Sequence, residues 1–191
     1  MKIFEIGVSK TGTTSLGKAY EILGFKHKGK DPKLYTKFNN NKNYDILFEV
    51  IDKYDAFEDV PWHNYDVDYK EFDEKYPNSK FIILERDDES WIKSNEYYYS
   101  PEYNKGWETW EDFYLIDKRW ITDRDNLIIE RLQYKNSKYI EIKKYFKNRP
   151  EDLLVMNICN GEEWEVLCSF LNKAIPKVPF PKLNVYGDYD E

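Results

Sequence analysis

The sequence predicts an α/β protein with a central parallel sheet and helices on both faces. Two short segments are almost wholly apolar, residues 80–85 (KFIILE) and residues 153–158 (LLVMNI). Such runs are typical of strands that are buried on both faces. The segments between the apolar runs have apolar residues three or four positions apart, which indicates amphipathic helices. Strands that alternate with helices favour a parallel sheet in a three-layer fold.

The first unit along the chain is a strand, a glycine loop and a helix. Residues 2–8 (KIFEIGV) form the expected strand, and the loop that follows carries several turn-forming residues. Residues 14–23 have apolar side chains at helical spacing, so we expect a helix there. Gly24 follows directly, and glycine is the preferred residue just beyond the end of a helix.

The middle of the chain is expected to hold three helices, a short strand and the first of the two buried strands. Asn and Lys dominate residues 39–43, for which we predict a surface loop. The predicted elements are, in order, a helix at 46–54, a strand at 55–58, a helix at 66–76, a strand at 80–85 and a helix at 88–97.

The last third of the chain is predicted to contain three more helices and the second buried strand. Residues 106–146 have apolar spacing near 3.6, and we expect two helices with a break near Asn136 and Ser137. The strand at 153–158 follows. A helix then opens near Gly161, with a core-facing side formed by Trp164, Leu167, Cys168 and Leu171.

Composition limits the possible functions. A chain of 191 residues fits one domain, expected over residues 1–191 with a helical annex at about 97–148. Aromatic residues make up 18% of the chain, which excludes a disordered protein. The net charge of −7 disfavours a nucleic-acid partner, so an anionic ligand would need a local site.

The sequence also predicts the compartment. No apolar run is long enough to cross a bilayer, and residues 1–6 lack a secretory signal. We therefore expect a cytoplasmic protein without a membrane partner, and its oligomeric state stays open. Cys159 and Cys168 are expected to be small core residues, and two Cys with two His make a zinc site improbable.

A ligand of such a sheet is expected beyond the carboxyl ends of the strands. Three segments lie there, namely residues 9–15, 58–63 and 86–94. They are the candidate parts of the functional site.

The first of these segments has the spacing of a phosphate-binding loop. Gly7 and Gly12 frame a G-x-x-x-x-G pattern between a strand and a helix, where backbone N–H groups can surround an anion. The ATP-binding motif continues with Lys, whereas here the lysine, Lys10, lies inside the loop. The alternative is a capped glycine turn with Lys10 in solvent. Further donors are available from Ser9, Thr11, Thr13, Thr14 and Ser15.

These residues resemble a known family. The run Lys10–Leu16 (KTGTTSL) is similar to the 5′-phosphosulfate loop of sulfotransferases that use 3′-phosphoadenylyl sulfate (PAPS). Arg86 ends a buried strand and Ser94 follows eight positions later, which resembles the 3′-phosphate motif of that family. The alternative is that Arg86 pairs with neighbouring acids. Residues 149–155 and 161–168 resemble a compact branch of the P-loop sulfotransferases, although a basic stretch near the C-terminus is missing.

The resemblance implies a P-loop sulfotransferase-like fold and a PAPS-dependent activity. The chain would move a sulfuryl group to a hydroxyl or amine of a small-molecule or glycan acceptor and release adenosine 3′,5′-bisphosphate (PAP), with no metal required. Lys10 would act in catalysis as well as in binding. The implied cofactor-binding residues are Ser9, Lys10, Thr11, Gly12, Thr13, Thr14, Ser15, Arg86 and Ser94.

The acceptor also needs a base. Asp59 stands two positions before Pro61, where many sulfotransferases have a histidine, and the compact branch has a similar Asp-x-Pro. We expect Asp59 to be the base, with His63 as the second candidate because its ordinary pKa suits proton transfer. The alternatives are that Asp59 caps a turn and that His63 is an exposed loop residue.

Other expectations are more open. Trp62, Tyr65 and residues 97–110 are candidates for an acceptor pocket, although packing explains most of these aromatic residues equally well. A P-loop kinase is a second possible function, but residues 85–86 (ER) stand where its magnesium-binding acid is expected. A non-catalytic nucleotide-binding relative is the third.

Overall fold

Five parallel strands form the sheet at the centre of the computed structural model, which describes residues 1–99 and 122–183. The strand order is β2-β3-β1-β4-β5, and all four pairings are parallel. The prediction of a parallel sheet is therefore confirmed. The strands are β1 (Ile3–Glu5), β2 (His27–Lys28), β3 (Ala56–Phe57), β4 (Lys80–Leu84) and β5 (Leu153–Met156).

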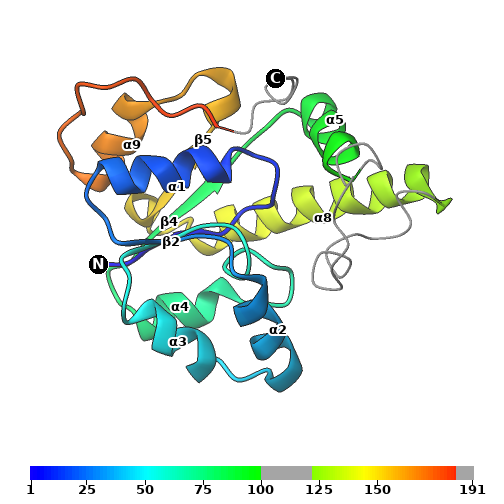
Figure 1. Cartoon of the computed structure of the whole chain (residues 1–191), viewed down its shortest axis with the longest axis horizontal. Coiled ribbons are helices and arrows are strands. Elements are labelled where there is room, and N and C mark those ends of the chain that lie inside the picture. Colours follow the sequence, from blue (N-terminus) through cyan, green and yellow to red (C-terminus); the bar gives the residue numbers. More distant parts are fainter. Residues whose placement is uncertain (100–121, 184–191) are drawn as a thin grey trace.

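Helices cover both faces of the sheet, as Figure 1 shows. The helix α1 and the helix α9 lie on one face, and α2, α3, α4 and α8 lie on the other. The described helices are α1 (Thr13–Ile22), α2 (Pro32–Asn41), α3 (Asp45–Ile51), α4 (Tyr69–Lys75), α5 (Asp88–Tyr98), α8 (Arg124–Tyr145) and α9 (Trp164–Leu171), with two 3₁₀ turns, η1 (Pro150–Asp152) and η2 (Ile158–Asn160).

The alternation of side chains along each strand builds two separate cores. Ile82 and Leu84 pack with α1 and α9, whereas Phe81 and Ile83 pack with the helices on the opposite face. Successive residues of a strand point to opposite sides of the sheet. Because helices cover both sides, the residues on both sides of β4 are apolar. The near-continuous apolar run of β4 follows from this double burial.

Stacked aromatic rings fill the core below the sheet. The Phe4 ring lies 4.9 Å from Phe57, 4.8 Å from Phe72 and 5.6 Å from Phe81, measured between ring centroids. These rings come from three strands and from α4. Their contacts fix the central strands relative to one another, and thereby position the loops that leave those strands.

The helix α2 was not predicted, and the surface loop expected at residues 39–43 is partly wrong. The last turn of α2 includes residues 39–41, and the chain leaves the helix at Lys42 with a φ of 50°. The start of α2 is set by Asp31, whose carboxylate accepts from the Leu34 amide, and by Pro32 at the first helical position. This capping pair was the signal that the sequence offered.

The break predicted near Asn136 and Ser137 is also wrong, because α8 runs through both residues. The Ser137 hydroxyl bonds the Tyr134 carbonyl, so this polar residue is satisfied within the helix. The helix α8 lies in the region predicted as a helical annex, and its opposite side contributes Tyr139 and Ile142 to the core. Residues 100–121, which include most of the first predicted helix, lie outside the described residues.

The two cysteines differ in their surroundings. Cys168 is buried in the α9 core, whereas Cys159 is exposed, so the expectation of a core residue is wrong for Cys159. The Cys159 thiol lies 3.7 Å from the Thr11 carbonyl oxygen. Within the described ranges, no helix combines the length and the apolar character that crossing a membrane requires.

A matched pair of isoleucines tests the two-sided burial of β4. Ile82 is fully buried and Ile140 on α8 is 67% exposed. We expect Ile82→Ala to lower the free energy of unfolding by about 2–5 kcal/mol, because a large core side chain leaves a cavity. Ile140→Ala should change it by less than about 0.5 kcal/mol. Urea denaturation of both variants measures the difference, and equal losses would contradict this account of the core.

Candidate active site

The three segments predicted to carry function meet at one edge of the sheet. The strands β3, β1 and β4 are neighbours, and all of them run parallel. Their carboxyl ends therefore lie side by side, and the loops that start at residues 6, 58 and 85 leave from the same edge. The fold brings the glycine loop, the Asp59 segment and Arg86 together for this reason.

The glycine loop contains two residues with a left-handed backbone conformation. Lys10 has a φ of 68°, and Gly12 has a φ of 105°. Gly12 is the residue before α1, and its carbonyl accepts from the Leu16 amide. A side chain at Gly12 would be strained at this φ, so glycine is needed to turn the loop into the helix. The Thr11 hydroxyl bonds the Val8 carbonyl at 2.8 Å and stabilises the turn.

Two side chains, one from α5 and one from the segment that precedes α5, bind carbonyl groups of the glycine loop. An Arg86 Nη1 donates to the Lys10 carbonyl at 3.0 Å, and the Trp91 indole donates to the Ser9 carbonyl at 2.9 Å. In the part of the chain that the structure describes, the amides of residues 10–12 donate to no protein acceptor. Amides grouped before a helix N-terminus form a ready site for a phosphate. The loop therefore fits the 5′ end of a nucleotide donor.

The hydroxyl residues at the start of α1 do not all face the loop in the same way. Thr13 and Ser15 are buried, and Thr14 is exposed. The Ser15 hydroxyl accepts from the Leu183 amide at 3.0 Å, so it fastens the C-terminal segment to α1. Thr14 is thus the most exposed hydroxyl residue of this run.

Gly7 has a different role from the one that the motif suggested. A Cβ at this position would lie 2.8 Å from the Glu5 Oε1 and 3.0 Å from the Tyr139 hydroxyl. The missing side chain therefore makes room for protein groups. Gly7 belongs to the acid–base part of the site, which is described below.

Lys10 is a partly buried ammonium group at the site. Its Nζ lies 4.1 Å from the centre of the Tyr98 ring. Burial lowers the pKa of Lys10 to about 8; the charge of Asp59 opposes this effect, and Arg86 and Lys30 add to it. The alternative in which Lys10 lies in solvent is therefore not what the structure shows. A bound anion would relieve the unfavourable burial of this cation.

Arg86 points to the glycine loop. Besides its bond to the Lys10 carbonyl, its Nε donates to the Ser90 hydroxyl at 2.9 Å. Asp87 instead caps α5 by accepting from the Ser90 amide, and Asp88 pairs with Lys135. The alternative in which Arg86 is taken up by these acids is not what the structure shows.

Ser94 lies one turn beyond Ser90 on the same helix and is partly buried. The first hydroxyl partner of Arg86 is Ser90, which the sequence analysis did not single out. Its position four residues after Arg86 was the available signal. Whether Ser94 contacts a nucleotide stays a prediction.

A buried histidine lies between two carboxylates. His63 is only 6% exposed, and its Nδ1 lies 2.7 Å from the Glu5 Oε2. Its Nε2 lies 3.8 Å from the Asp59 Oδ1. Burial alone would lower the pKa of His63, but the charge and hydrogen bond of Glu5, with the charge of Asp59, raise it. The alternative of an exposed loop histidine is therefore wrong.

Asp59 is the more open member of this group. Its φ is 63°, and its Oδ1 accepts from the Val60 amide at 2.7 Å. The side chain is 22% exposed, in contrast to the buried His63 and Glu5. Since Asp59 also acts on the pKa of Lys10, these residues share one site.

The comparison with protein families decides the identity of the fold. A family model described as a sulfotransferase domain matches residues 2–189, nearly the whole chain. The chain belongs to the sulfotransferase family. This family is PAPS-dependent, and the five-stranded parallel sheet agrees with its fold. No curated protein matches the sequence significantly.

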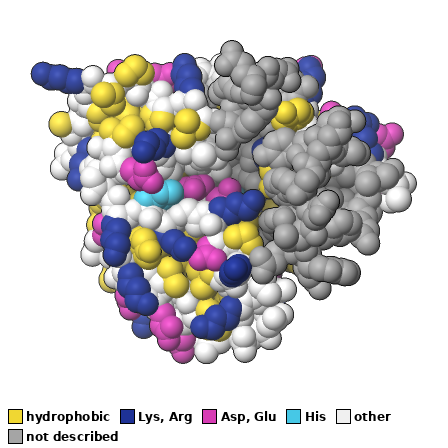
Figure 2. Space-filling model, viewed as in Figure 1, with side chains coloured by type: hydrophobic (Ala, Val, Ile, Leu, Met, Phe, Trp, Pro, Cys, Tyr) yellow, Lys and Arg dark blue, Asp and Glu magenta, His cyan; other side chains and the backbone are white. Residues whose placement is uncertain are grey.

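The positive charge of this sulfotransferase is local. Lys10, Lys30 and Arg86 are close enough for both of the others to lower the pKa of Lys10. Figure 2 shows basic and acidic side chains mixed over the described part of one face of the molecule. A donor anion would thus be held by these few cations and by the loop amides, as the net charge of −7 requires.

A second pair of titratable groups, the buried Glu58 and the partly buried His27, lies beside the site. The Glu58 Oε1 is 3.3 Å from the His27 Nε2. Glycines at positions 17 and 29 leave room for the pair, because a Cβ at Gly29 would lie 2.5 Å from the Glu58 Oε1. Burial raises the pKa of Glu58 to about 7, and the charge of Asp59 adds to it while His27 opposes it. This pair could not be predicted from the sequence, because its two members are far apart in the chain.

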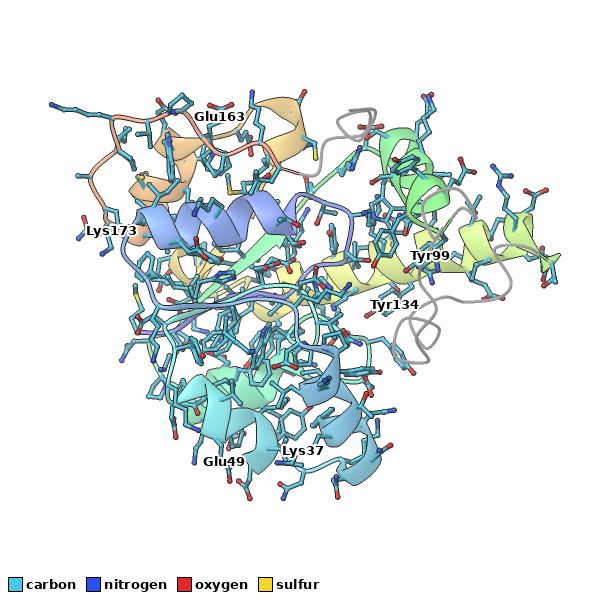
Figure 3. The ribbon with its side chains drawn as sticks, viewed as in Figure 1. Lys37, Glu49, Tyr99, Tyr134, Glu163 and Lys173 are labelled. Carbon is cyan, nitrogen blue, oxygen red and sulfur yellow. The ribbon has the colours of Figure 1, made fainter. Side chains whose placement is uncertain are left out.

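The aromatic residues expected in an acceptor pocket are only partly placed there. Trp62 is a core residue, packed at 4.7 Å against Phe57, so that expectation is wrong. Tyr65 is 77% exposed. Tyr99 lies at the end of α5, on the side of the molecule where α8 passes (Figure 3), and Arg131 lies 4.9 Å from its ring centre. Trp107, Trp110 and the rest of residues 100–110 lie outside the described residues.

The pKa of Lys10 predicts a pH dependence of nucleotide binding. A protonated Lys10 attracts the anion. Above about pH 8, Lys10 of the free protein is mostly neutral and must take up a proton before it can attract PAP. The dissociation constant of PAP should then rise by about tenfold per pH unit. Isothermal titration between pH 7 and pH 10 measures this slope.

The matched control is Lys10→Arg, since arginine keeps its proton over this range. The variant should bind PAP with little pH dependence. If wild type and variant gave the same slope above pH 8, another group would be responsible.

Proposed function

We propose that this chain transfers a sulfuryl group from PAPS to a hydroxyl or amine of a small-molecule or glycan acceptor. The observation that carries the proposal is the set of amides in residues 10–12 that lack protein acceptors, next to the Lys10 ammonium and across from Asp59. A donor anion and an acceptor base would thus meet at one strand edge. The acceptor class is the part that the family alone leaves open.

The donor would be bound in two places. The loop amides, Lys10 and the hydroxyl of Thr14 would hold the 5′-phosphosulfate, and Arg86 with Ser94 would hold the 3′-phosphate. The bound donor supplies the sulfuryl group, whose bond to the 5′-phosphate oxygen breaks as the acceptor atom bonds to sulfur. Lys10 would stabilise the negative charge that develops on this phosphate oxygen.

Asp59 is the better candidate for the base. His63 Nδ1 lies 2.7 Å from the Glu5 Oε2, and Glu5 and Asp59 raise the pKa of His63, so its ring is less available to accept the acceptor proton than the open Asp59 carboxylate. Asp59 is partly exposed and would take the acceptor proton on its carboxylate. A weak base is sufficient, since a hydroxyl becomes strongly acidic as its oxygen bonds to sulfur.

Thermal-shift measurements separate this function from the kinase alternative. PAP should raise the melting temperature in the absence of a metal, whereas ATP with Mg²⁺ should have a smaller effect. A shift with ATP and Mg²⁺ alone would refute the proposal. Sulfuryl transfer from labelled PAPS to a panel of phenols, alcohols, amines and sugars then separates an enzyme from a non-catalytic relative.

We also propose that the protein works in the cytoplasm. Cys159 and Cys168 are both free thiols. A reducing compartment suits such a protein.

The role of Asp59 can be tested by a substitution that keeps its shape. Asp59→Asn should lower kcat for sulfuryl transfer by about 10²–10⁴-fold, because the acceptor proton loses its base. The dissociation constant of PAP should change less than about twofold, measured by titration calorimetry on the same protein. Asp45→Asn, at an exposed position on α3, is the control and should leave kcat unchanged. Full activity of Asp59→Asn would remove Asp59 from the mechanism.

A further inference from the structure

One buried carboxylate has no part in the function proposed so far. Glu5 ends β1 and is 0% exposed, although all its neighbours in the strand are apolar. Burying a carboxylate is costly unless it is paired and hydrogen-bonded. The strand could end on an apolar residue without this cost, so the carboxylate calls for another explanation.

Both oxygens of Glu5 are occupied, and each contacts a different part of the site. Oε1 accepts from the Gly7 amide at 2.7 Å, and Oε2 lies 2.7 Å from the His63 Nδ1. Gly7 begins the glycine loop, and the Nε2 of His63 faces Asp59. Glu5 therefore links the anion-binding loop to the acid–base residues through two direct contacts.

The surroundings of His63 determine its charge. Glu5 on β1 and Asp59 on the same loop favour the imidazolium ion. Lys138 on α8 disfavours it and donates to the His63 carbonyl at 2.6 Å. The pKa of Lys138 is itself lowered to about 8, chiefly by burial. Among the described residues, Lys138 also faces Glu5 without bonding it, as do Tyr20, Glu58 and Tyr139.

We propose that Glu5 is a positioning residue of the transfer reaction: it holds His63 as an imidazolium ion that keeps Asp59 ionised and oriented, and it fixes the start of the donor loop through the Gly7 amide. This inference rests on the proposed function, in which Asp59 is the base. With Nδ1–H given to Glu5, the Nε2 of the imidazolium ion faces the Asp59 Oδ1 across 3.8 Å, and the Oδ2 of Asp59 would take the acceptor proton.

The charge of His63 can be measured without any activity assay. The chain has only two histidines, so proton NMR resolves both Cε1–H signals, and His27→Gln assigns them. In the wild type we expect His63 to titrate above its ordinary range. Glu5→Gln, which keeps the shape of the side chain, should lower that midpoint by about one pH unit or more. A wild-type His63 that is already neutral at pH 7 would overturn the proposal, whatever the variant does.

Glu58→Gln is the matched control. Glu58 is another buried carboxylate at the end of a neighbouring strand, but it does not bond His63. The midpoint of His63 should stay within about 0.3 pH units of the wild type in this variant. An equal shift in Glu5→Gln and Glu58→Gln would point to general burial effects and would overturn a specific role for Glu5.

Kinetics test the consequence for the reaction. Glu5→Gln should lower kcat by at least about tenfold and shift the acidic limb of the pH profile, with a smaller effect on the affinity for PAP. Glu5→Asp keeps the charge and should recover part of kcat. Unchanged kcat in a folded Glu5→Gln protein would overturn the positioning role. Absence of transfer in the wild type would instead refute the proposed function, and the NMR titration would still report on the contact between Glu5 and His63.

Discussion

The hydrogen bonds that hold the carbonyl groups of the glycine loop are the constraint on which the site depends. Arg86 and Trp91 bind the carbonyls of Lys10 and Ser9, so the amides of the same turn are left for a ligand. A single turn cannot impose this arrangement on itself, because the loop would otherwise relax toward internal bonding. The parallel sheet makes it possible, since β1 and β4 are adjacent and deliver both segments to one edge.

Local electrostatics explain how an acidic protein can bind an anionic donor. The protein as a whole repels anions, but a few partly buried cations act at short range and in a medium less polar than water. Burial also lowers the pKa of Lys10. Binding a phosphate would therefore stabilise both the ligand and the lysine. The carboxylates of Asp59 and Glu5 carry the opposite charge to these cations. They lie on the acceptor side of the site, so the donor and acceptor sides differ in the sign of their charge.

Most of the sheet, and the three segments that meet at its carboxyl edge, could be predicted from the sequence because they follow from local patterns. The apolar run of β4 and the glycines around Lys10 are signals within a few residues. The contacts of Glu5 with His63 and of Glu58 with His27 could not be predicted, since each pair joins distant segments. The short β2 strand, with two residues, offered no periodicity to detect. A helix break was wrongly predicted at Asn136 and Ser137, because polar side chains are also compatible with a helix whose opposite side is buried.

The close approach of Glu5 to Gly7 has an evolutionary consequence. In related chains, the acid at the end of the first strand and the first glycine of the loop should change together. Where an apolar residue replaces the acid, the steric reason for that glycine is weakened, and alanine becomes tolerable if the tyrosine of α8 is also smaller. The second glycine, which needs a left-handed backbone, should be retained in both lineages.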